Sequence, residues 1–180
     1  MRLKKIRLKN IRSYEDQEFE FPEGSLLLSG DIGSGKTSIL LALEYALFGL
    51  QPGQKGGALL RNKEDLGEVT LEMDLPNKNV IIERKLKRTS KGISNEQSAI
   101  TINGKRLESS VTEVKSKIVD LLGYPQEFVK KSNLLYRYTV FTPQEQMKQI
   151  ILEDSETRLN VLRHIFGIEK YRTIKNNVSL

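Results

Sequence analysis

Apolar and polar residues alternate along several short stretches of the chain, and this period of two is typical of strands with one buried face. Residues 1–9 place Ile6 and Leu8 between basic residues, and residues 17–21 alternate in the same way. The polar residues 10–14 between these stretches predict a bend. The chain is therefore predicted to begin with two strands.

Two further alternating stretches, residues 69–75 and 80–86, lie on either side of Pro76-Asn77 and predict an antiparallel pair. Asn103-Gly104 is flanked by two short β-type runs and is the strongest short signal for a hairpin. The middle of the chain is therefore predicted to add a second antiparallel group of strands.

Helical spacing and capping signals predict several helices. Residues 38–50 are apolar on nearly every face, which predicts a helix inside the domain. Ser110 and Glu113 form a capping box that opens another helix, and Gly123 ends it. The later elements predicted in the same way are a strand over residues 134–141 and helices over 142–152, 155–166 and from 168 onward.

Two segments are predicted to be loops. Residues 49–67 contain five glycines, which indicates a long loop. Lys85, Lys87, Arg88 and Lys91 make a basic, Ser-rich segment, for which a solvated surface and a phosphate contact are both open.

Residues 30–37, Gly-Asp-Ile-Gly-Ser-Gly-Lys-Thr, match the phosphate-binding P-loop pattern G-x-x-x-x-G-K-[ST]. The apolar run at residues 25–29 predicts a buried parallel strand before it, and the predicted helix from Ser38 follows it. Strand, Gly-rich turn and helix N-terminus are the parts that this anion site requires. An ordinary Gly-rich turn is the alternative, but the flanking segments favour a nucleotide site.

The residue types of the P-loop suit ATP and Mg²⁺ as cofactors. The glycines allow a sharp turn that aims backbone N–H groups at phosphate oxygens. Lys36 supplies a positive charge to the outer phosphates, and the Thr37 hydroxyl is suited to Mg²⁺.

Composition narrows the functional classes. The 180 residues include no cysteine, which excludes disulfides and thiolate metal sites, and the single histidine, His164, cannot build a transition-metal site alone. The net charge of +6 fits an acidic partner such as nucleic acid without requiring one. No apolar run is long enough to span a membrane, so a cytoplasmic location is expected.

One part of a complete P-loop ATPase is not found in the sequence, namely an apolar strand that ends in an acid and helps to orient water. Asp74 lies in an alternating strand, and Asp120 lies inside the capped helix. Leu28-Ser29-Gly30-Asp31 is similar to the signature motif of transporter ATPases, but it is the entry to the P-loop itself. The chain is therefore interpreted as one half of a catalytic site.

Residues 8–14 (Leu-Lys-Asn-Ile-Arg-Ser-Tyr), the P-loop and residues 141–145 (Phe-Thr-Pro-Gln-Glu) carry a family resemblance over essentially the whole chain. The sequence resembles the N-terminal ATPase lobe of the SbcC-type (Rad-fifty) double-strand-break-repair ATPases, relatives of the structural-maintenance-of-chromosomes proteins. The resemblance implies an α/β head of the ABC/SMC type, with a mixed β-sheet around the P-loop helix and an antiparallel β subdomain. It also implies a lobe over residues 1–153 and helices over 154–180 that lead into a coiled coil.

The resemblance further implies which residues form the site. Gln144 matches the Q-loop glutamine that contacts Mg²⁺ and the γ-phosphate, and Arg12 and Ser13 match phosphate-side contacts. Residues 61–63 resemble the segment that reaches base and ribose, with the register left open. Ile32 stands where many members have Asn, a change that a backbone role tolerates. The implied catalytic residues are Lys36 and Gln144, the implied metal ligands are Thr37 and Gln144, and the implied nucleotide-binding residues are Arg12, Ser13, Asp31, Ile32, Gly33, Ser34, Gly35, Lys36, Thr37, Ser38, Arg61, Asn62, Lys63 and Gln144.

In that family a second lobe, beyond a long coiled coil, supplies the missing strand, the catalytic acid and a signature motif. This chain is accordingly interpreted as the ATP-binding half of a head, cut off where the coiled coil begins. The implied partners are the C-terminal lobe, a second head in a homodimer, an SbcD-type nuclease and double-stranded DNA ends, with no membrane, in a nucleoid-associated location. ATP-driven head dimerisation would control DNA-end binding and the nuclease.

Three alternative functions are open from the sequence: a chromosome-condensation ATPase, a RecF-like recombination ATPase and a transporter ATPase subunit. The first two share the P-loop and the general shape of the lobe, but the helices after Gln144 favour the break-repair group over the RecF type. A transporter subunit requires an aromatic residue that stacks on adenine, a role that Tyr14 could mimic.

Overall fold

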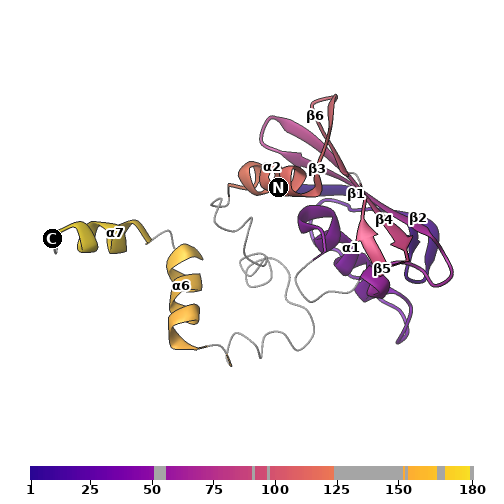
Figure 1. Cartoon of the computed structure of the whole chain (residues 1–180), viewed down its shortest axis with the longest axis horizontal. Coiled ribbons are helices and arrows are strands. Elements are labelled where there is room, and N and C mark those ends of the chain that lie inside the picture. The colour runs from indigo at the N-terminus through magenta and orange to yellow at the C-terminus, as the bar shows by residue number, and fades with distance from the viewer. Residues whose placement is uncertain are drawn as a thin grey trace. The chain divides into compact units, whose positions relative to one another are not determined.

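A computed structural model of the chain describes residues 1–50, 56–90, 92–96, 98–123, 152, 154–165 and 169–178. The chain divides into two compact units, Met1–Ser132 and Asn133–Leu180. Among the described residues, Figure 1 shows strands and helices in the first unit and helices in the second. Each unit is described by itself below.

The described strands of the first unit form a single sheet in which every pairing is antiparallel. The spatial order is β2-β1-β3-β4-β6-β7, and β5 pairs with β4 beside this path. The strands are β1 (Arg2–Ile11), β2 (Tyr14–Glu20), β3 (Leu66–Leu75), β4 (Lys78–Thr89), β5 (Gly92–Asn95), β6 (Ser98–Ile102) and β7 (Lys105–Ser109).

Two turns set the register of the predicted hairpins. Asn77, with φ 61°, lies in the turn between β3 and β4, so that Leu75 pairs with Lys78. Asn103 and Gly104, with φ 48° and 80°, turn the chain between β6 and β7, as expected for a two-residue hairpin loop. Both predicted hairpins are confirmed.

One face of the sheet is apolar and packs against helix α1 (Lys36–Phe48), as Figure 1 shows. This helix begins at the P-loop and buries nine of its 13 residues, which confirms the prediction of an internal helix. The buried side chains of the sheet that form this core include Ile6, Leu8, Val69, Leu71, Met73, Val80, Ile82 and Leu86. The P-loop helix is therefore anchored to the three central strands of the sheet.

Helix α2 (Val111–Leu121) has the predicted capping box. The Ser110 Oγ accepts a hydrogen bond from the Glu113 N–H at 3.3 Å, and the Glu113 Oε2 accepts one from the Ser110 N–H at 3.1 Å. Val114 and Ile118 are buried as predicted, and α2 contacts both α1 and β6.

The described part of the second unit contains α6 (Ser155–Ile165) and α7 (Glu169–Val178), which confirms the two predicted helices. Tyr171, Ile174 and Val178 are spaced along α7 as on one helix face, and all three are exposed. None of the described helices is long and apolar enough to cross a membrane. The predicted strand at 134–141 and most of the predicted helix at 142–152 lie outside the described residues, and the predicted domain boundary after residue 153 stays a prediction.

The prediction of a buried parallel strand at residues 25–29 is wrong. These residues form no strand, and the side chains of Leu26 and Leu27 are 47% and 86% exposed. A parallel strand requires a neighbouring strand that runs in the same direction. The described strands pair only with one another, so none of them pairs with residues 25–29. The parallel part of the predicted mixed sheet is thus missing among the described residues, while its antiparallel part is confirmed.

The interpretation of the basic segment as a loop is also wrong. Lys85, Lys87 and Arg88 belong to β4, where buried Leu86 continues the alternation of the strand. Each basic side chain faces an acid: Lys85 pairs with Glu68 at 4.0 Å, Lys87 with Glu96 at 3.0 Å and Arg88 with Asp65 at 3.8 Å. These basic residues belong to the charged surface of the sheet.

Part of the predicted Gly-rich loop at residues 49–67 is packed into the fold. Gly56–Ala58 form a 3-10 turn, and Leu59 and Leu60 are buried. Leu60 also forms an isolated β-bridge with Ile11 at the end of β1. This bridge brings the loop beside the bend that follows β1.

Candidate functional site

The P-loop is a turn that leads directly into the start of α1. Gly30, Gly33 and Gly35 have φ values of 145°, 87° and 94°, in a region that strains other residues. The Ser34 N–H donates to the Asp31 carbonyl at 3.2 Å, and the Ser38 N–H donates to the Gly35 carbonyl at 2.8 Å. The glycines of the motif thus have the conformational role that the sequence predicts.

The start of α1 is open to an anion. Gly35 is its N-cap and provides no side-chain hydrogen bond, and the first turn contains no acidic residue. The first N–H groups of a helix lack partners within the helix, and the helix dipole places partial positive charge beside them. Such a helix start is suited to phosphate.

The ammonium group of Lys36 folds back over the loop. Its Nζ lies 2.7 Å from the carbonyl oxygens of both Gly30 and Asp31, and 3.1 Å from the Ser34 Oγ. All its acceptors are neutral, whereas a phosphate oxygen carries charge and makes a shorter and stronger hydrogen bond. Lys36 is therefore held where its ammonium group could donate its hydrogen bonds to a bound phosphate in place of these neutral acceptors.

The bend between β1 and β2 forms the second wall of the site. A hollow of about 450 Å³ is lined by Arg12 and Ser13 from this bend and by residues 33–38 of the P-loop and α1. The structure thus brings Arg12, Ser13, Gly33, Ser34, Gly35, Lys36, Thr37 and Ser38 together. Asp31 takes part through its carbonyl, and the side chain of Ile32 is fully exposed to solvent.

The bend packs tightly on the P-loop. A Cβ atom at Gly35 would lie 2.6 Å from the Tyr14 Oη and 3.0 Å from the Ser13 Oγ, so any side chain there would force Tyr14 to shift. The ring of Tyr14 packs edge-on against Phe19, with 5.3 Å between ring centroids, and burial raises the pKa of the Tyr14 hydroxyl. From the sequence, Tyr14 is a candidate only for mimicking an adenine-stacking residue. The structure instead places its hydroxyl group against the P-loop backbone.

Within the segment predicted to reach base and ribose, the side chain of Arg61 contacts the bend. Its Nη1 donates to the Ser13 carbonyl at 2.8 Å, and its Nη2 pairs with the Glu15 carboxylate at 2.7 Å. Asn62 and Lys63 do not line the P-loop hollow, and Lys63 lines a separate hollow with β3 and β4 residues. Their contact with a nucleotide stays a prediction.

The metal ligands proposed from the resemblance are Thr37 and Gln144. Thr37 lines the P-loop hollow, where an oxygen donor beside phosphates suits Mg²⁺. Gln144 lies outside the described residues, so its role stays a prediction. The described residues contain no cluster of three His, Cys, Asp or Glu side chains that could hold a metal ion by themselves.

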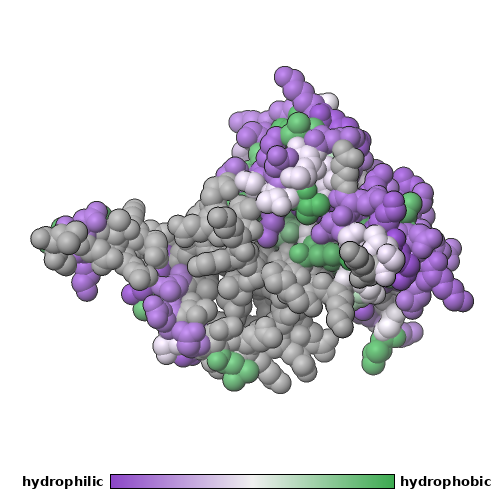
Figure 2. Space-filling view, viewed as in Figure 1, coloured by the Kyte–Doolittle hydropathy of each residue, from purple (hydrophilic) through white to green (hydrophobic). Residues whose placement is uncertain are grey.

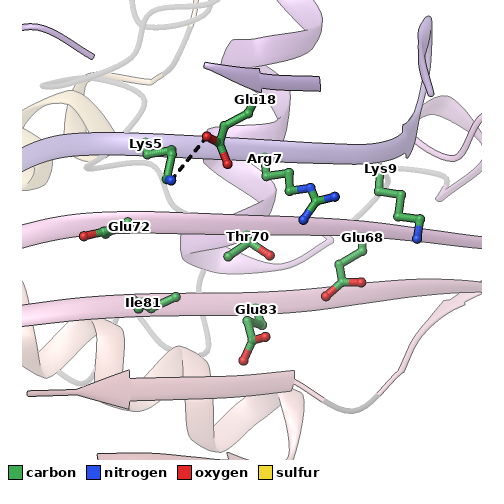
Figure 3. A pocket seen from close by; sticks show the side chains of 9 residues that line it. All are labelled: Lys5, Arg7, Lys9, Glu18, Glu68, Thr70, Glu72, Ile81 and Glu83. Atoms are coloured by element: carbon green, nitrogen blue, oxygen red, sulfur yellow. Dashed lines mark ion pairs between the residues drawn. The ribbon is translucent and has the colours of Figure 1, made fainter. Parts of the chain in front are cut away.

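A second hollow lies on the open face of the sheet, where Lys5, Arg7 and Lys9 of β1 lie beside acidic side chains of neighbouring strands (Figure 3). Lys5 pairs with Glu18 at 3.2 Å. Arg7 binds both carboxylate oxygens of Asp16, at 2.8 and 2.7 Å, and this hydrogen bonding lowers the pKa of Asp16. These charges pair across strands. In Figure 2, the face of this unit turned toward the viewer is coloured mostly as hydrophilic.

Comparisons with known proteins find relatives over nearly the whole chain. A protein-family model described as an AAA domain matches residues 5–178, nearly the whole chain. A DNA double-strand break repair Rad50 ATPase from Thermoplasma acidophilum is 31% identical over 170 residues, which cover 94% of this chain and 18% of that protein.

Two further relatives match over nearly the full chain. The DNA double-strand break repair Rad50 ATPase of Archaeoglobus fulgidus is 28% identical over 98% of this chain and 18% of its own length. Arcadin-4 of Pyrobaculum calidifontis is 29% identical over 99% of this chain and 21% of its own length. Among solved structures, the recombination mediator RecF with ATP covers 63% of this chain and 29% of that chain, with 27% identity and a TM-score of 0.49. The chain thus spans about a fifth of the length of these curated relatives.

Proposed function

The chain belongs to the AAA-domain family, and from this premise we propose that it is the ATP-binding half of a DNA double-strand-break-repair ATPase. The observation that carries the proposal is the P-loop hollow, in which an uncapped helix start, Lys36 and the Arg12–Ser13 bend face one space. The two Rad50 ATPases that match nearly the whole chain favour break repair over the chromosome-condensation, RecF-like and transporter alternatives.

In this proposal the chain binds the phosphates of ATP from two sides. The N–H groups of the P-loop and Lys36 bind the outer phosphates, and Arg12 and Ser13 contact them from the bend. The Thr37 hydroxyl and Gln144 hold Mg²⁺, which neutralises negative charge on the β- and γ-phosphates. Asn62 and Lys63, next to Arg61, belong to the segment proposed to approach base and ribose.

Hydrolysis in this proposal requires a second lobe. No Asp or Glu side chain lines the described P-loop hollow, so the described residues offer no acid to orient water there. We place the catalytic acid in a C-terminal lobe of the same protein and the signature motif in the lobe of a partner head. ATP binding would then close two heads into a homodimer, which acts on double-stranded DNA ends together with an SbcD-type nuclease in the cytoplasm, at the nucleoid.

The direct test is nucleotide binding by a Lys36→Ala variant. Lys36 is the only charged side chain of the P-loop that lines the hollow, and charge-assisted hydrogen bonds contribute about 1.5–3 kcal/mol each. We expect calorimetry with ATP and Mg²⁺ to show affinity at least about tenfold weaker than that of the wild-type chain. Lys105→Ala, which removes an exposed lysine of β7, serves as the matched control and should bind like wild type. Equal affinity of the Lys36→Ala and wild-type chains would overturn the proposal.

A further inference from the structure

The bend beside the P-loop contains two strained residues. Asn10 and Arg12 have φ values of 52° and 51°, and they flank Ile11, which is fully buried. Residues other than glycine rarely adopt this left-handed conformation, and it persists only where the surroundings impose it. The contacts that hold residues 10–14 therefore decide where Arg12 and Ser13 lie.

Segment 59–61 supplies the backbone part of these contacts. The Arg12 N–H donates to the Leu59 carbonyl at 2.8 Å, and the Arg61 N–H donates to the Asn10 carbonyl at 3.0 Å. The Asn10 Nδ2 donates to the Leu66 carbonyl at 3.0 Å. These bonds fix the first half of the bend, up to the Arg12 N–H.

The second half of the bend is held by the guanidinium group of Arg61. Its Nη1 donates to the Ser13 carbonyl at 2.8 Å and lies 3.5 Å from the Arg12 carbonyl. Its Nη2 pairs with Glu15, whose side chain is 79% exposed against 29% for Arg61. An ion pair with so exposed a carboxylate stabilises little, which leaves the contact with the Ser13 carbonyl as the specific one.

We propose that Arg61 is a positioning residue, whose guanidinium holds the Arg12–Ser13 segment against the P-loop instead of contacting base or ribose. The planar guanidinium spans the Ser13 carbonyl and the Glu15 carboxylate with separate nitrogen atoms. Ser13 and Tyr14 in turn pack on Gly35, so release of the bend would move one wall of the nucleotide site. This inference rests on the proposed function insofar as the site binds ATP.

The first test compares four variants of the full chain by calorimetry with ATP and Mg²⁺. Arg61→Ala should bind about tenfold more weakly than wild type, and Arg61→Lys should not restore affinity, because the shorter side chain with its point-like ammonium does not place a donor where Nη1 meets the Ser13 carbonyl. Glu15→Gln should stay within about twofold of wild type, since the exposed ion pair is dispensable. Arg88→Ala, the control, should also stay within about twofold of wild type. Arg88 donates a hydrogen bond to the carbonyl of Glu64, in the same loop as Arg61, at 3.0 Å, but it does not hold the bend.

A double-mutant cycle separates positioning from direct contact. If Arg61 acts through the bend, Arg61→Ala should weaken binding by less than about twofold in a chain that already carries Arg12→Ala and Ser13→Ala. If the guanidinium contacts the nucleotide itself, the full loss should persist in that background, and the positioning role would be overturned.

Hydrogen exchange without nucleotide gives a readout that does not depend on ATP binding. The Tyr14 amide, in the strand pair with Ile11 that closes the half of the bend held by Arg61, should exchange at least about tenfold faster in Arg61→Ala than in wild type or Arg88→Ala. Unchanged exchange would refute the positioning role whatever the affinities are. A wild-type chain that binds no ATP would refute the proposed function instead, and the exchange measurement would still decide whether Arg61 holds the bend.

Discussion

Gly35 is the residue at which the P-loop and the bend approach most closely. Its φ of 94° strains any side chain, and a Cβ there would lie 2.6 Å from the Tyr14 Oη and 2.9 Å from the Tyr14 Cζ. We expect Gly35→Ala to lower the free energy of unfolding by about 2–4 kcal/mol, as the sum of backbone strain and overpacking. Urea denaturation measures this loss.

Gly33→Ala is the matched control for steric contact, because Gly33 has a similar φ of 87° but nothing within 4 Å of its Cβ position. Only backbone strain of about 1–2 kcal/mol is expected there. Equal destabilisation by the two variants would show that the packing of Tyr14 on Gly35 contributes nothing to stability.

Gln144 lies outside the described residues, and its role rests on the resemblance of residues 141–145 to the Q-loop. We expect Gln144→Ala to leave ATP binding largely intact and to reduce hydrolysis in a protein assembled with the C-terminal lobe, because the amide orders metal and water more than it anchors the nucleotide. Gln146→Ala, two residues further on, is the control. A wild-type turnover rate in Gln144→Ala would show that Gln144 has no role in hydrolysis and is an ordinary residue of the predicted helix.

At the scale of elements, Arg84 joins β4 to the end of the P-loop helix. Its side chain is fully buried, its Nε donates to the Ala46 carbonyl at 2.7 Å and its Nη2 to the Leu47 carbonyl at 3.3 Å. Burial lowers the pKa of Arg84 to about 10, so the guanidinium stays charged at neutral pH. A cation at the C-terminal end of a helix also interacts favourably with the helix dipole.

Arg84→Met removes these donors while retaining much of the side-chain volume. We expect the free energy of unfolding to fall by about 2–4 kcal/mol, because buried carbonyl groups at the end of α1 lose their partners. Arg88→Ala, on the exposed end of β4, should cost less than about 1 kcal/mol in the same urea titration. A loss below about 1 kcal/mol for Arg84→Met would mean that α1 does not depend on this cap.

The elements that the sequence predicted correctly are those encoded by local patterns. Alternation defined β3 and β4, Asn103-Gly104 defined the β6–β7 turn, and Ser110 with Glu113 defined the start of α2. The strand expected at residues 25–29 failed for the opposite reason, since a parallel strand depends on a neighbour remote in sequence. An apolar run alone cannot report whether that neighbour is present.

The same distinction separates the predicted and the unpredicted parts of the candidate site. The P-loop motif located the hollow, and the resemblance placed Arg12 and Ser13 beside it, as the structure does. The contacts of Arg61 with Ser13 and of Arg84 with α1 join residues that are 48 and 38 positions apart. No local period or motif marks such contacts, so only the folded chain could show them.

At the scale of the whole molecule, two observations support the proposal that the site is shared with another lobe. The P-loop hollow has no acidic side chain among its described lining residues. The apolar run before the P-loop is exposed, with Leu27 86% accessible to solvent. A second lobe would supply both an acid and a cover for the apolar run.

We therefore expect residues 1–180 alone to bind ATP but to hydrolyse it hardly at all, and turnover to return when the matching C-terminal lobe is added. Phosphoryl transfer depends on positioning and charge stabilisation, so loss of the acid and the signature motif should reduce the rate about a thousandfold or more. The exposed run should also make the isolated chain poorly soluble. ATPase rates and solubility with and without the C-terminal lobe measure both effects.

Two controls make this last comparison decisive. The Lys36→Ala chain mixed with the same lobe should stay inactive, which assigns the recovered turnover to this P-loop and not to a contaminant. The amides of residues 25–29 should exchange more slowly in the mixture, because a segment that pairs with a neighbouring strand gains hydrogen bonds. If the isolated chain turns over ATP as fast as the mixture, it contains its own catalytic acid outside the described residues, and the half-site interpretation is wrong.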